Sequence, residues 1–158
     1  MPAYPPAPAD EEIRLIVAEH AALEGPLLPI LHALQEAFGH IPANAEAPIT
    51  AALGITRAEL RGVISFYHDF RKAPAGRHVV KICRAEACQA VGAEALSARV
   101  LERLGLDAHG DTPNGAVTIE PVYCLGLCAC GPAAMVDGKV IGRVDAARMD
   151  AILTELGA

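Results

Sequence analysis

Residues 78–88 read HVVKICRAEAC, an apolar run that ends in one cysteine and is followed five residues later by another. The β-branched residues of 78–83 predict a strand. After it, residues 90–104 have the apolar spacing of a helix, and Gly105 marks the end of that helix. A second strand is expected over 116–122, so the helix would cross over between two strands of one sheet.

The remainder of this half predicts a hairpin and a last helix. Asp137-Gly138 lies between two short apolar runs, 133–136 and 139–144, which is a strong hairpin pattern. Asp145 is placed to cap the final helix. The resulting order β-α-β-β-β-α, with one crossover helix, predicts an α/β fold with a thioredoxin-like sheet.

The first half has a helical pattern instead. Four helices are expected: one from Glu11 capped by Asp10, one over 27–38 ending at Gly39, one from Pro48 to Gly54, and one running to Phe66 from a Thr56–Glu59 capping box. The turn-rich KAPAG stretch at 72–76 separates the two halves. We therefore expect a disordered tail over 1–10, a helical domain over 11–75 and an α/β domain over 76–158.

The composition excludes several functions. The chain has 13 basic and 19 acidic residues and a net charge of −6, which disfavours nucleic acid and anionic membrane surfaces as partners. Its first twelve residues, MPAYPPAPADEE, do not resemble a secretory signal. No apolar run is long enough to span a bilayer. The sequence thus predicts a cytoplasmic protein without direct membrane insertion, in which cysteines act as ligands more often than as disulfides.

Four of the five cysteines form two closely spaced pairs. Cys83 and Cys88 are separated by four residues, Cys124 and Cys128 by three, and 35 residues lie between the pairs. A [2Fe–2S] cluster needs four thiolates, two on each iron, and two loops that carry two cysteines each meet that need. The spacing therefore predicts that these four residues bind a [2Fe–2S] cluster.

The surroundings of the pairs suit an anionic cluster. Both pairs follow predicted strands, and Cys88 is expected just before the crossover helix, whose N-terminus would stabilise thiolates. Gly126 would let the backbone pass close to sulfur. Four apolar side chains are expected to exclude water from the site: Leu125, Leu127, Ala133 and Met135.

Spacing alone leaves other readings open. Structural zinc accepts similar cysteine pairs, so a zinc-stabilised interaction module without a redox role is the alternative from another class. Disulfides are disfavoured by the odd cysteine count, and thiol catalysis by the lack of a C-x-x-C motif. Cys130, the fifth cysteine, is interpreted as a small buried apolar residue.

Several motifs, in order along the chain, resemble one family. They are LPILHALQEAFGHIP at 28–42, GVISFYHDF at 62–70, APAG at 73–76 and CLGLCACGP at 124–132, together with the C-x4-C…C-x3-C pattern. This set resembles the thioredoxin-like [2Fe–2S] subunits of NADH dehydrogenase modules, which include the 24-kDa-type subunit of respiratory complex I. Related subunits occur in NAD-reducing hydrogenases and NAD-dependent formate dehydrogenases.

The resemblance implies a division of roles. Cys83 and Cys88 would hold one iron, and Cys124 and Cys128 the other. A partner subunit would bind FMN and NAD and exchange electrons with this cluster. The HDFR stretch at 68–71 and the VYCLGLCACGPAA stretch at 122–134 look most like the gamma subunit of molybdenum-containing, NAD-dependent formate dehydrogenases. That likeness implies a molybdenum-containing catalytic subunit as a second partner.

The helical half would then serve as a docking domain for the flavin subunit. We expect Phe66 and Phe70 to lie in the core and Tyr67, His68 and Arg71 to contact the partner. A free-standing thioredoxin-like ferredoxin that dimerises is a further hypothesis. No G-x-G-x-x-G nucleotide loop and no paired acid–base site occur in the sequence, so the chain is expected to be non-catalytic alone.

Overall fold

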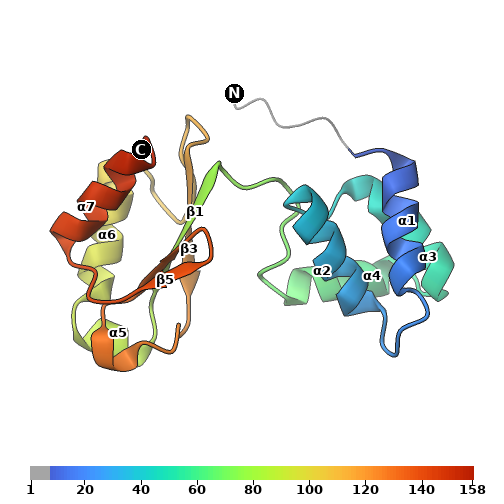
Figure 1. The fold of residues 1–158 in the computed structure, drawn as a ribbon, viewed down its shortest axis with the longest axis horizontal. Helices are drawn as coiled ribbons and strands as arrows, with labels where there is room; N and C mark the ends of the chain where they lie inside the picture. Colours follow the sequence, from blue (N-terminus) through green and yellow to red (C-terminus); the bar gives the residue numbers. More distant parts are fainter. Residues whose placement is uncertain (1–7) are drawn as a thin grey trace. The chain divides into compact units, whose positions relative to one another are not determined.

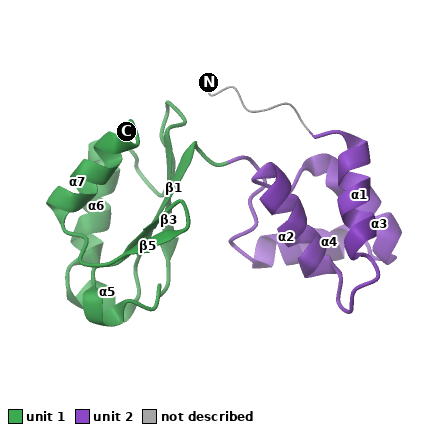
Figure 2. Cartoon of the chain, in the orientation of Figure 1, with its two compact units in different colours: residues 1–2, 75–158 green, residues 3–74 purple. Residues whose placement is uncertain are grey.

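The computed structural model describes residues 8–158. They form two compact units that divide after Pro74, coloured separately in Figure 2. We call residues 8–74 the helical unit and residues 75–158 the sheet unit. Most of the tail expected over 1–10 lies outside the described residues, and Asp10 is already the first residue of a helix.

The helical unit contains α1 (Asp10–His20), α2 (Leu27–Phe38), the short 3-10 helix η1 (Ala43–Ala45), α3 (Glu46–Leu53) and α4 (Arg57–Phe66). Gly39 and Gly54 end two of these helices in the left-handed conformation, as glycine does readily. Thr56 and Glu59 form the predicted capping box, with each side chain bonded to the other's backbone N–H.

Two helix starts differ from the prediction by one or two residues. Helix α1 is capped at Ala9, not at Asp10, because Glu12 accepts a hydrogen bond from the Ala9 backbone N–H at 3.3 Å. Helix α3 begins at Glu46, so Pro48 lies in its first turn. A proline there interrupts no bond, because the first N–H groups of a helix have no partner within it.

The core of the helical unit is aliphatic, and Phe70 is its buried aromatic residue. Helix α4 contributes Leu60 and Ile64, which lie one turn apart. The expectation that Phe66 is also in the core is wrong, since its side chain is 73% exposed. Phe66 is the last residue of α4 and falls on the opposite face from Ile64, whereas Phe70 follows the helix and turns inward.

The sheet unit contains β1 (His78–Cys83), α5 (Glu86–Ala90), α6 (Ala93–Leu104), β2 (Gly110–Asp111), β3 (Val117–Val122), the 3-10 helix η2 (Cys128–Cys130), β4 (Ala134–Val136), β5 (Lys139–Ile141) and α7 (Ala146–Glu155). The strand order is β2-β3-β1-β4-β5. Strands β1 and β3 run parallel, and the other neighbours are antiparallel. The single parallel pair is the one that the crossover helix joins.

The crossover helix predicted over 90–104 begins at Ala93, as α6, and the short helix α5 before it was not predicted. Val91 ends α5 and Gly92 adopts a positive φ of 95° before α6 begins. The two-residue strand β2 was not predicted, because two residues carry no periodic pattern. Strands β4 and β5 are short and surround the predicted Asp137-Gly138 turn, where both residues have positive φ.

Helices α6 and α7 lie side by side on one face of the sheet (Figure 1). Between them and the sheet is a second apolar core, built around Val80, Ile82 and Ile119 of the strands and Met149 and Leu153 of α7. This core supports the ends of β1 and β3. Within residues 8–158, no helix has the length and apolar character needed to cross a lipid bilayer.

Candidate metal centre

The parallel pairing of β1 and β3 brings the two cysteine pairs to one end of the sheet. Cys83 is the last residue of β1 and lies opposite Val122, the last residue of β3. Cys124 follows Val122 by two residues. Backbone bonds join the two strand ends, with Arg84 N–H donating to the Val122 carbonyl at 2.8 Å. The pairing of these two strands therefore brings the two cysteine pairs to the same place, although 35 residues separate them in the sequence.

Short helices carry the second cysteine of each pair. Cys88 lies within α5, and Cys128 is the first residue of η2. Cys88 was expected before a long helix, stabilised by that helix's N-terminus. This expectation is wrong, because α5 has only five residues and contains Cys88 itself. The groups that stabilise sulfur here are therefore individual backbone N–H groups.

The thiols meet in pairs. The Cys124 and Cys128 sulfurs are 3.7 Å apart. Two thiolates on one tetrahedral ion, with metal–sulfur bonds of about 2.3 Å, would lie about 3.8 Å apart. Cys83 and Cys88 share a hydrogen bond, the charge of Cys128 acts on Cys88, and the charge of Cys83 acts on Cys128. All four thiols thus belong to one site.

The arrangement fits a two-iron group. Two pairs of cysteines at one end of the sheet are what a [2Fe–2S] cluster uses, with two thiolates for each iron. The donor set is entirely thiolate, which suits iron–sulfur chemistry.

A cradle of backbone N–H groups surrounds the sulfur of Cys83. Cys124 has a positive φ of 80°, which is rare for a residue other than glycine, and Gly126 has a φ of 77°. This backbone directs the successive N–H groups of Cys124 and Leu125 at the Cys83 sulfur. Consecutive N–H groups of this kind form an anion-binding concavity.

These bonds favour the thiolate form of Cys83. Burial opposes ionisation of this thiol, but the N–H groups of Ala85, Cys124 and Leu125, together with the Cys88 thiol, outweigh burial. The pKa of Cys83 therefore lies below its ordinary value. Deprotonation is required before a cysteine can bind a metal.

The pKa values of two other cysteines lie above the ordinary value. Burial and the neighbouring Cys83 raise the pKa of Cys88, against a hydrogen bond from the Ala133 N–H. The hydrogen bond and charge of Cys124 raise the pKa of Cys128. Four thiolates in one place repel one another, so a bound cation is needed to neutralise them.

The two pairs differ in exposure. Cys83 and Cys88 are 1% and 2% exposed, whereas Cys124 and Cys128 are both exposed. Ala133 is buried beside the inner pair, and Leu125 and Leu127 pack against it as predicted. Met135 does not belong to this apolar group, since its neighbour Ala134 is the β4 residue that faces the core. The site therefore has a buried half and an outward half.

Cys130 is half-buried and lies against the backbone at the end of β5. Its carbonyl accepts a hydrogen bond from the Arg143 N–H at 2.6 Å, and Gly142 passes close to it. A Cβ at Gly142 would lie 2.9 Å from the Cys130 carbonyl oxygen. This contact holds η2, and with it Cys128, against the strand.

Comparison with known proteins identifies the family. Residues 13–157 match the family model described as "Thioredoxin-like [2Fe-2S] ferredoxin". The chain belongs to the thioredoxin-like [2Fe–2S] ferredoxin family. It is 31% identical over 150 residues to the NADP-reducing hydrogenase subunit HndA of Solidesulfovibrio fructosivorans, covering 95% of this chain and 88% of that one. It is 32% identical over 133 residues to the NADH-quinone oxidoreductase subunit 2 of Thermus thermophilus, covering 84% and 74%.

A solved structure shares the fold. The crystal structure of an NAD+-reducing [NiFe]-hydrogenase in the H2-reduced state aligns with a TM-score of 0.69 and 27% identity, over 80% of this chain. This ferredoxin chain spans 22% of the length of that hydrogenase chain. The predicted thioredoxin-like fold, with helices preceding it, is therefore confirmed.

Family membership identifies the cofactor as a [2Fe–2S] cluster and the chain as an electron-transfer ferredoxin, in place of a zinc module.

The sequence alone does not reveal the backbone N–H groups that point at the cysteine sulfurs. The N–H donors of Ala85, Leu125 and Ala133 belong to the backbone and have no residue-type pattern. The one available signal was Gly126, which marks a tight turn beside the cysteines.

Proposed function

We propose that this ferredoxin carries single electrons between its [2Fe–2S] cluster and a flavin in a partner subunit of an NAD-linked oxidoreductase complex. The observation that supports it most is the cysteine site itself, with two thiol pairs and N–H groups directed at sulfur. The relatives named above are subunits of NADP- and quinone-linked oxidoreductases. In this proposal the chain carries the cluster, and the partner subunit binds the flavin and the nicotinamide nucleotide.

We assign the ligands by pairs. Cys83 and Cys88 hold the inner iron, and Cys124 and Cys128 hold the outer iron. The shared hydrogen bond within the first pair and the 3.7 Å sulfur separation within the second support this division. The bound cluster supplies one-electron oxidation and reduction. The N–H groups around Cys83 offset the negative charge that the cluster gains on reduction.

The outward half of the site is the side through which electrons pass. Cys124 and Cys128 are exposed, and Tyr123 beside them is 72% exposed. A flavin must come close to the cluster, because electron transfer slows steeply with distance. A partner seated over Tyr123 would shorten the route and exclude water from the outer thiolates.

The end of α4 and the loop after it form the proposed contact with the flavin subunit. Phe66 and Tyr67 are exposed, and their rings meet edge to face with centroids 5.1 Å apart. Tyr67 also contacts Phe70 at 5.9 Å, so the surface rings rest on a buried one. His68 and Arg71 lie in the same segment. Rigid aromatic and arginine side chains dominate binding energy at protein interfaces.

The finer assignment is to an NAD-dependent formate dehydrogenase, with a molybdenum-containing catalytic subunit as the second partner. It rests on residues 68–71 and 122–134, which resemble the gamma subunit of those enzymes. The alternatives are a subunit of respiratory NADH:quinone oxidoreductase or of an NAD-reducing hydrogenase. The named relatives are a hydrogenase subunit and a quinone oxidoreductase subunit, so they correspond to both alternative kinds.

Anaerobic purification of the chain tests the cofactor and its ligands. We expect about two irons and two acid-labile sulfides per chain, visible absorption, and an electron paramagnetic resonance signal after reduction with dithionite. A colourless protein with stoichiometric zinc and no sulfide would contradict the assignment.

Co-expression with the flavoprotein tests the electron route. We expect the two chains to co-purify and NADH to generate the reduced-cluster signal in the complex, but not in the isolated chain. A complex whose cluster responds to dithionite and never to NADH would contradict the route. In the complete complex, reduction of the cluster by formate would support the finer assignment. Reduction by hydrogen, or by NADH with no response to formate, would oppose it.

A further inference from the structure

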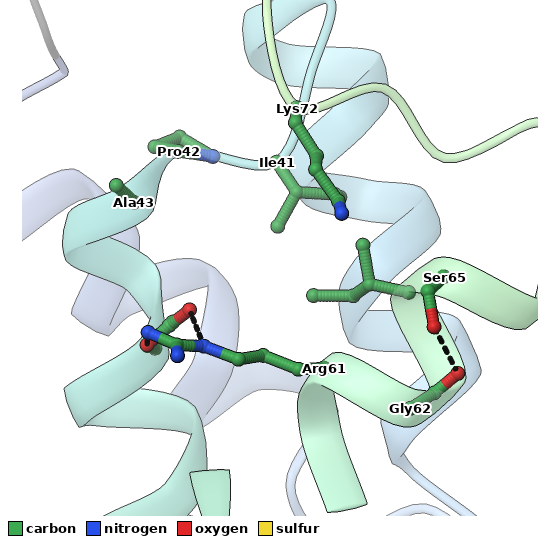
Figure 3. Close-up of a pocket in the computed structure, with 9 residues that line it drawn as sticks. Ile41, Pro42, Ala43, Arg61, Gly62, Ser65 and Lys72 are labelled. Atoms are coloured by element: carbon green, nitrogen blue, oxygen red, sulfur yellow. Dashed lines mark hydrogen bonds and ion pairs between the residues drawn. The ribbon is translucent and has the colours of Figure 1, made fainter. Parts of the chain in front are cut away.

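The helical unit contains a cavity of about 530 Å³ that the electron-transfer site does not use. It lies between η1 with the start of α3, helix α4, and the segment after α4 (Figure 3). Ile41 and Ile64 are 6% and 7% exposed and make its base apolar. Ser65 is also at the edge, with its hydroxyl donating to the Gly62 carbonyl at 3.0 Å.

Charged side chains line the rim. Arg61 donates two hydrogen bonds to the Glu46 carboxylate, at 2.8 and 2.9 Å, so this pair is internally neutral. Lys72 extends into the space between Ile41 and Ser65 (Figure 3), and it has no ion-pair partner within the described residues. The rim therefore carries one uncompensated positive charge above an apolar base.

Gly62 points to a ligand from outside the chain. Among residues 8–158, it is the one glycine inside a helix, where glycine destabilises the helix relative to alanine. A Cβ at this position would meet nothing within 4 Å, so no contact within the chain requires glycine. Close approach by another molecule would require it, because only glycine leaves the helix backbone bare at the cavity wall.

The charge distribution of the helical unit points to an acidic partner. Residues 8–74 contain nine acidic and five basic residues, yet residues 57–72 contain four of those basic residues and only two acidic ones. The cavity thus lies at the basic end of an acidic unit. Complementary charge steers a partner to such a patch and fixes its orientation.

The exposed rings indicate a protein in preference to a small molecule. Phe66 and Tyr67 directly follow Ser65 and lie outside the cavity. A small ligand would fill the cavity and leave both rings in water, whereas a protein would cover them together with the cavity. Interfaces combine an aromatic centre with a polar rim in this way.

We propose that this cavity receives a segment of the flavin-binding partner that presents one apolar side chain next to an aspartate or glutamate. The apolar side chain rests on Ile41 and Ile64 beside Gly62, and the carboxylate pairs with Lys72. The inference rests on the proposed function, because it gives a specific anchor to the docking of the flavin subunit.

Two variants of the holo-chain test the anchor by measured affinity for the purified flavoprotein. Gly62→Leu places a side chain in the cavity and should weaken binding at least about 10-fold. Lys72→Glu should also weaken it about 10-fold at low salt, and by clearly less in about 0.5 M salt, because screening removes exposed charge interactions. Cluster absorption should be unchanged in both.

Each variant has a matched control. Gly62→Ala adds one methyl group at the same point of the cavity wall and should weaken binding clearly less than Gly62→Leu does, because the smaller group displaces less of the partner. Arg14→Glu makes the same charge change on α1, away from the cavity, and should leave affinity nearly unchanged. Unchanged binding by both Gly62→Leu and Lys72→Glu would overturn the anchor while leaving the proposed function intact.

Two further outcomes also overturn the proposal. Failure of the wild-type chain to bind the flavoprotein would contradict both the anchor and the proposed function. If the two variants instead change self-association of the chain in sedimentation experiments and not its binding to the flavoprotein, the cavity receives a second copy.

Discussion

At the scale of single residues, the site distinguishes cysteines that lie only two positions apart. Cys128 contacts the Cys124 sulfur at 3.7 Å, whereas Cys130 is held by its backbone against Gly142 and Arg143. Spacing alone could not separate them, since either gives a plausible loop, and the motif at 124–132 favoured Cys128. The contact between the Cys124 and Cys128 sulfurs supports the same choice.

Serine variants should show this difference directly. Cys83→Ser and Cys124→Ser remove a proposed ligand and are expected to lose or strongly destabilise the cluster, as is Cys128→Ser. Cys130→Ser should leave the visible and paramagnetic spectra nearly unchanged. Iron and sulfide analysis measures the outcome, and a Cys130→Ser protein that bleaches while Cys128→Ser does not would disprove the assignment.

Gly142 is a positioning residue for the outer pair. In Gly142→Ala, the new methyl group would lie 2.9 Å from the Cβ and carbonyl oxygen of Cys130, so η2 must move and carry Cys128 with it. We expect lower cluster content and a shifted reduction potential, because the thiolate geometry changes. Gly62→Ala adds the same group in open space and should change neither quantity. Identical potentials for wild type and Gly142→Ala would refute this role.

At the scale of elements, the β4–β5 turn fastens the start of β1. Asp137 accepts hydrogen bonds from the Val79 backbone N–H and from the His78 ring, both at 2.8 Å. Burial opposes ionisation of this carboxyl, but these two bonds outweigh it and hold the pKa of Asp137 below its ordinary value. The turn thus stabilises the strand that ends at Cys83.

Removing the carboxylate should weaken the sheet unit in a pH-dependent way. Asp137→Ala is expected to cost about 1 kcal/mol of unfolding free energy at neutral pH, and Asp137→Asn less, since asparagine keeps an acceptor and tolerates positive φ. A lowered folded-state pKa stabilises above the unfolded pKa, and this contribution disappears as the pH falls through the folded pKa. The difference in unfolding free energy between wild type and Asp137→Ala, measured with urea, should therefore shrink as the solution is made acidic. A difference that stays constant from neutral pH to about pH 3 would contradict a stabilising role for the ionised carboxylate.

At the scale of the whole molecule, the two units have separate cores. The core of the helical unit uses only residues 13–70, and the cores of the sheet unit use residues 80–158. All four proposed ligands lie in the sheet unit. Cluster binding is therefore assigned to the sheet unit, and the main docking anchor to the helical unit.

This separation predicts a functional fragment. A chain of residues 75–158 should fold and bind the cluster with wild-type absorption, because its core and its cysteines are complete. It should bind the flavoprotein much more weakly than the full chain does, since it lacks α4 and the cavity. Loss of the cluster in the fragment, or unchanged affinity for the flavoprotein, would contradict the assignment.

Most of the elements were predictable, because local chemistry dictates them. The Thr56–Glu59 box, Gly39, Gly54 and the Asp137-Gly138 turn act through neighbouring backbone groups, and each lies where it was expected. Helix α5 was missed, since five residues are too short to show a helical period, and the start of α6 was placed three residues early, at Ala90. The exposure of Phe66 was missed because its spacing from Phe70 is meaningful only if the helix continues.

The sequence by itself determined that two cysteine pairs follow two strands, which is enough to predict a [2Fe–2S] cluster. The tertiary structure alone decided which pair is buried, because the burial of Cys83 and Cys88 depends on the packing of α5 and the loop at 124–128. It also decided the electrostatics of the site. Three backbone N–H groups converge on the Cys83 sulfur, two of them directed by the positive φ at Cys124, and backbone direction is set by the fold and not by residue type.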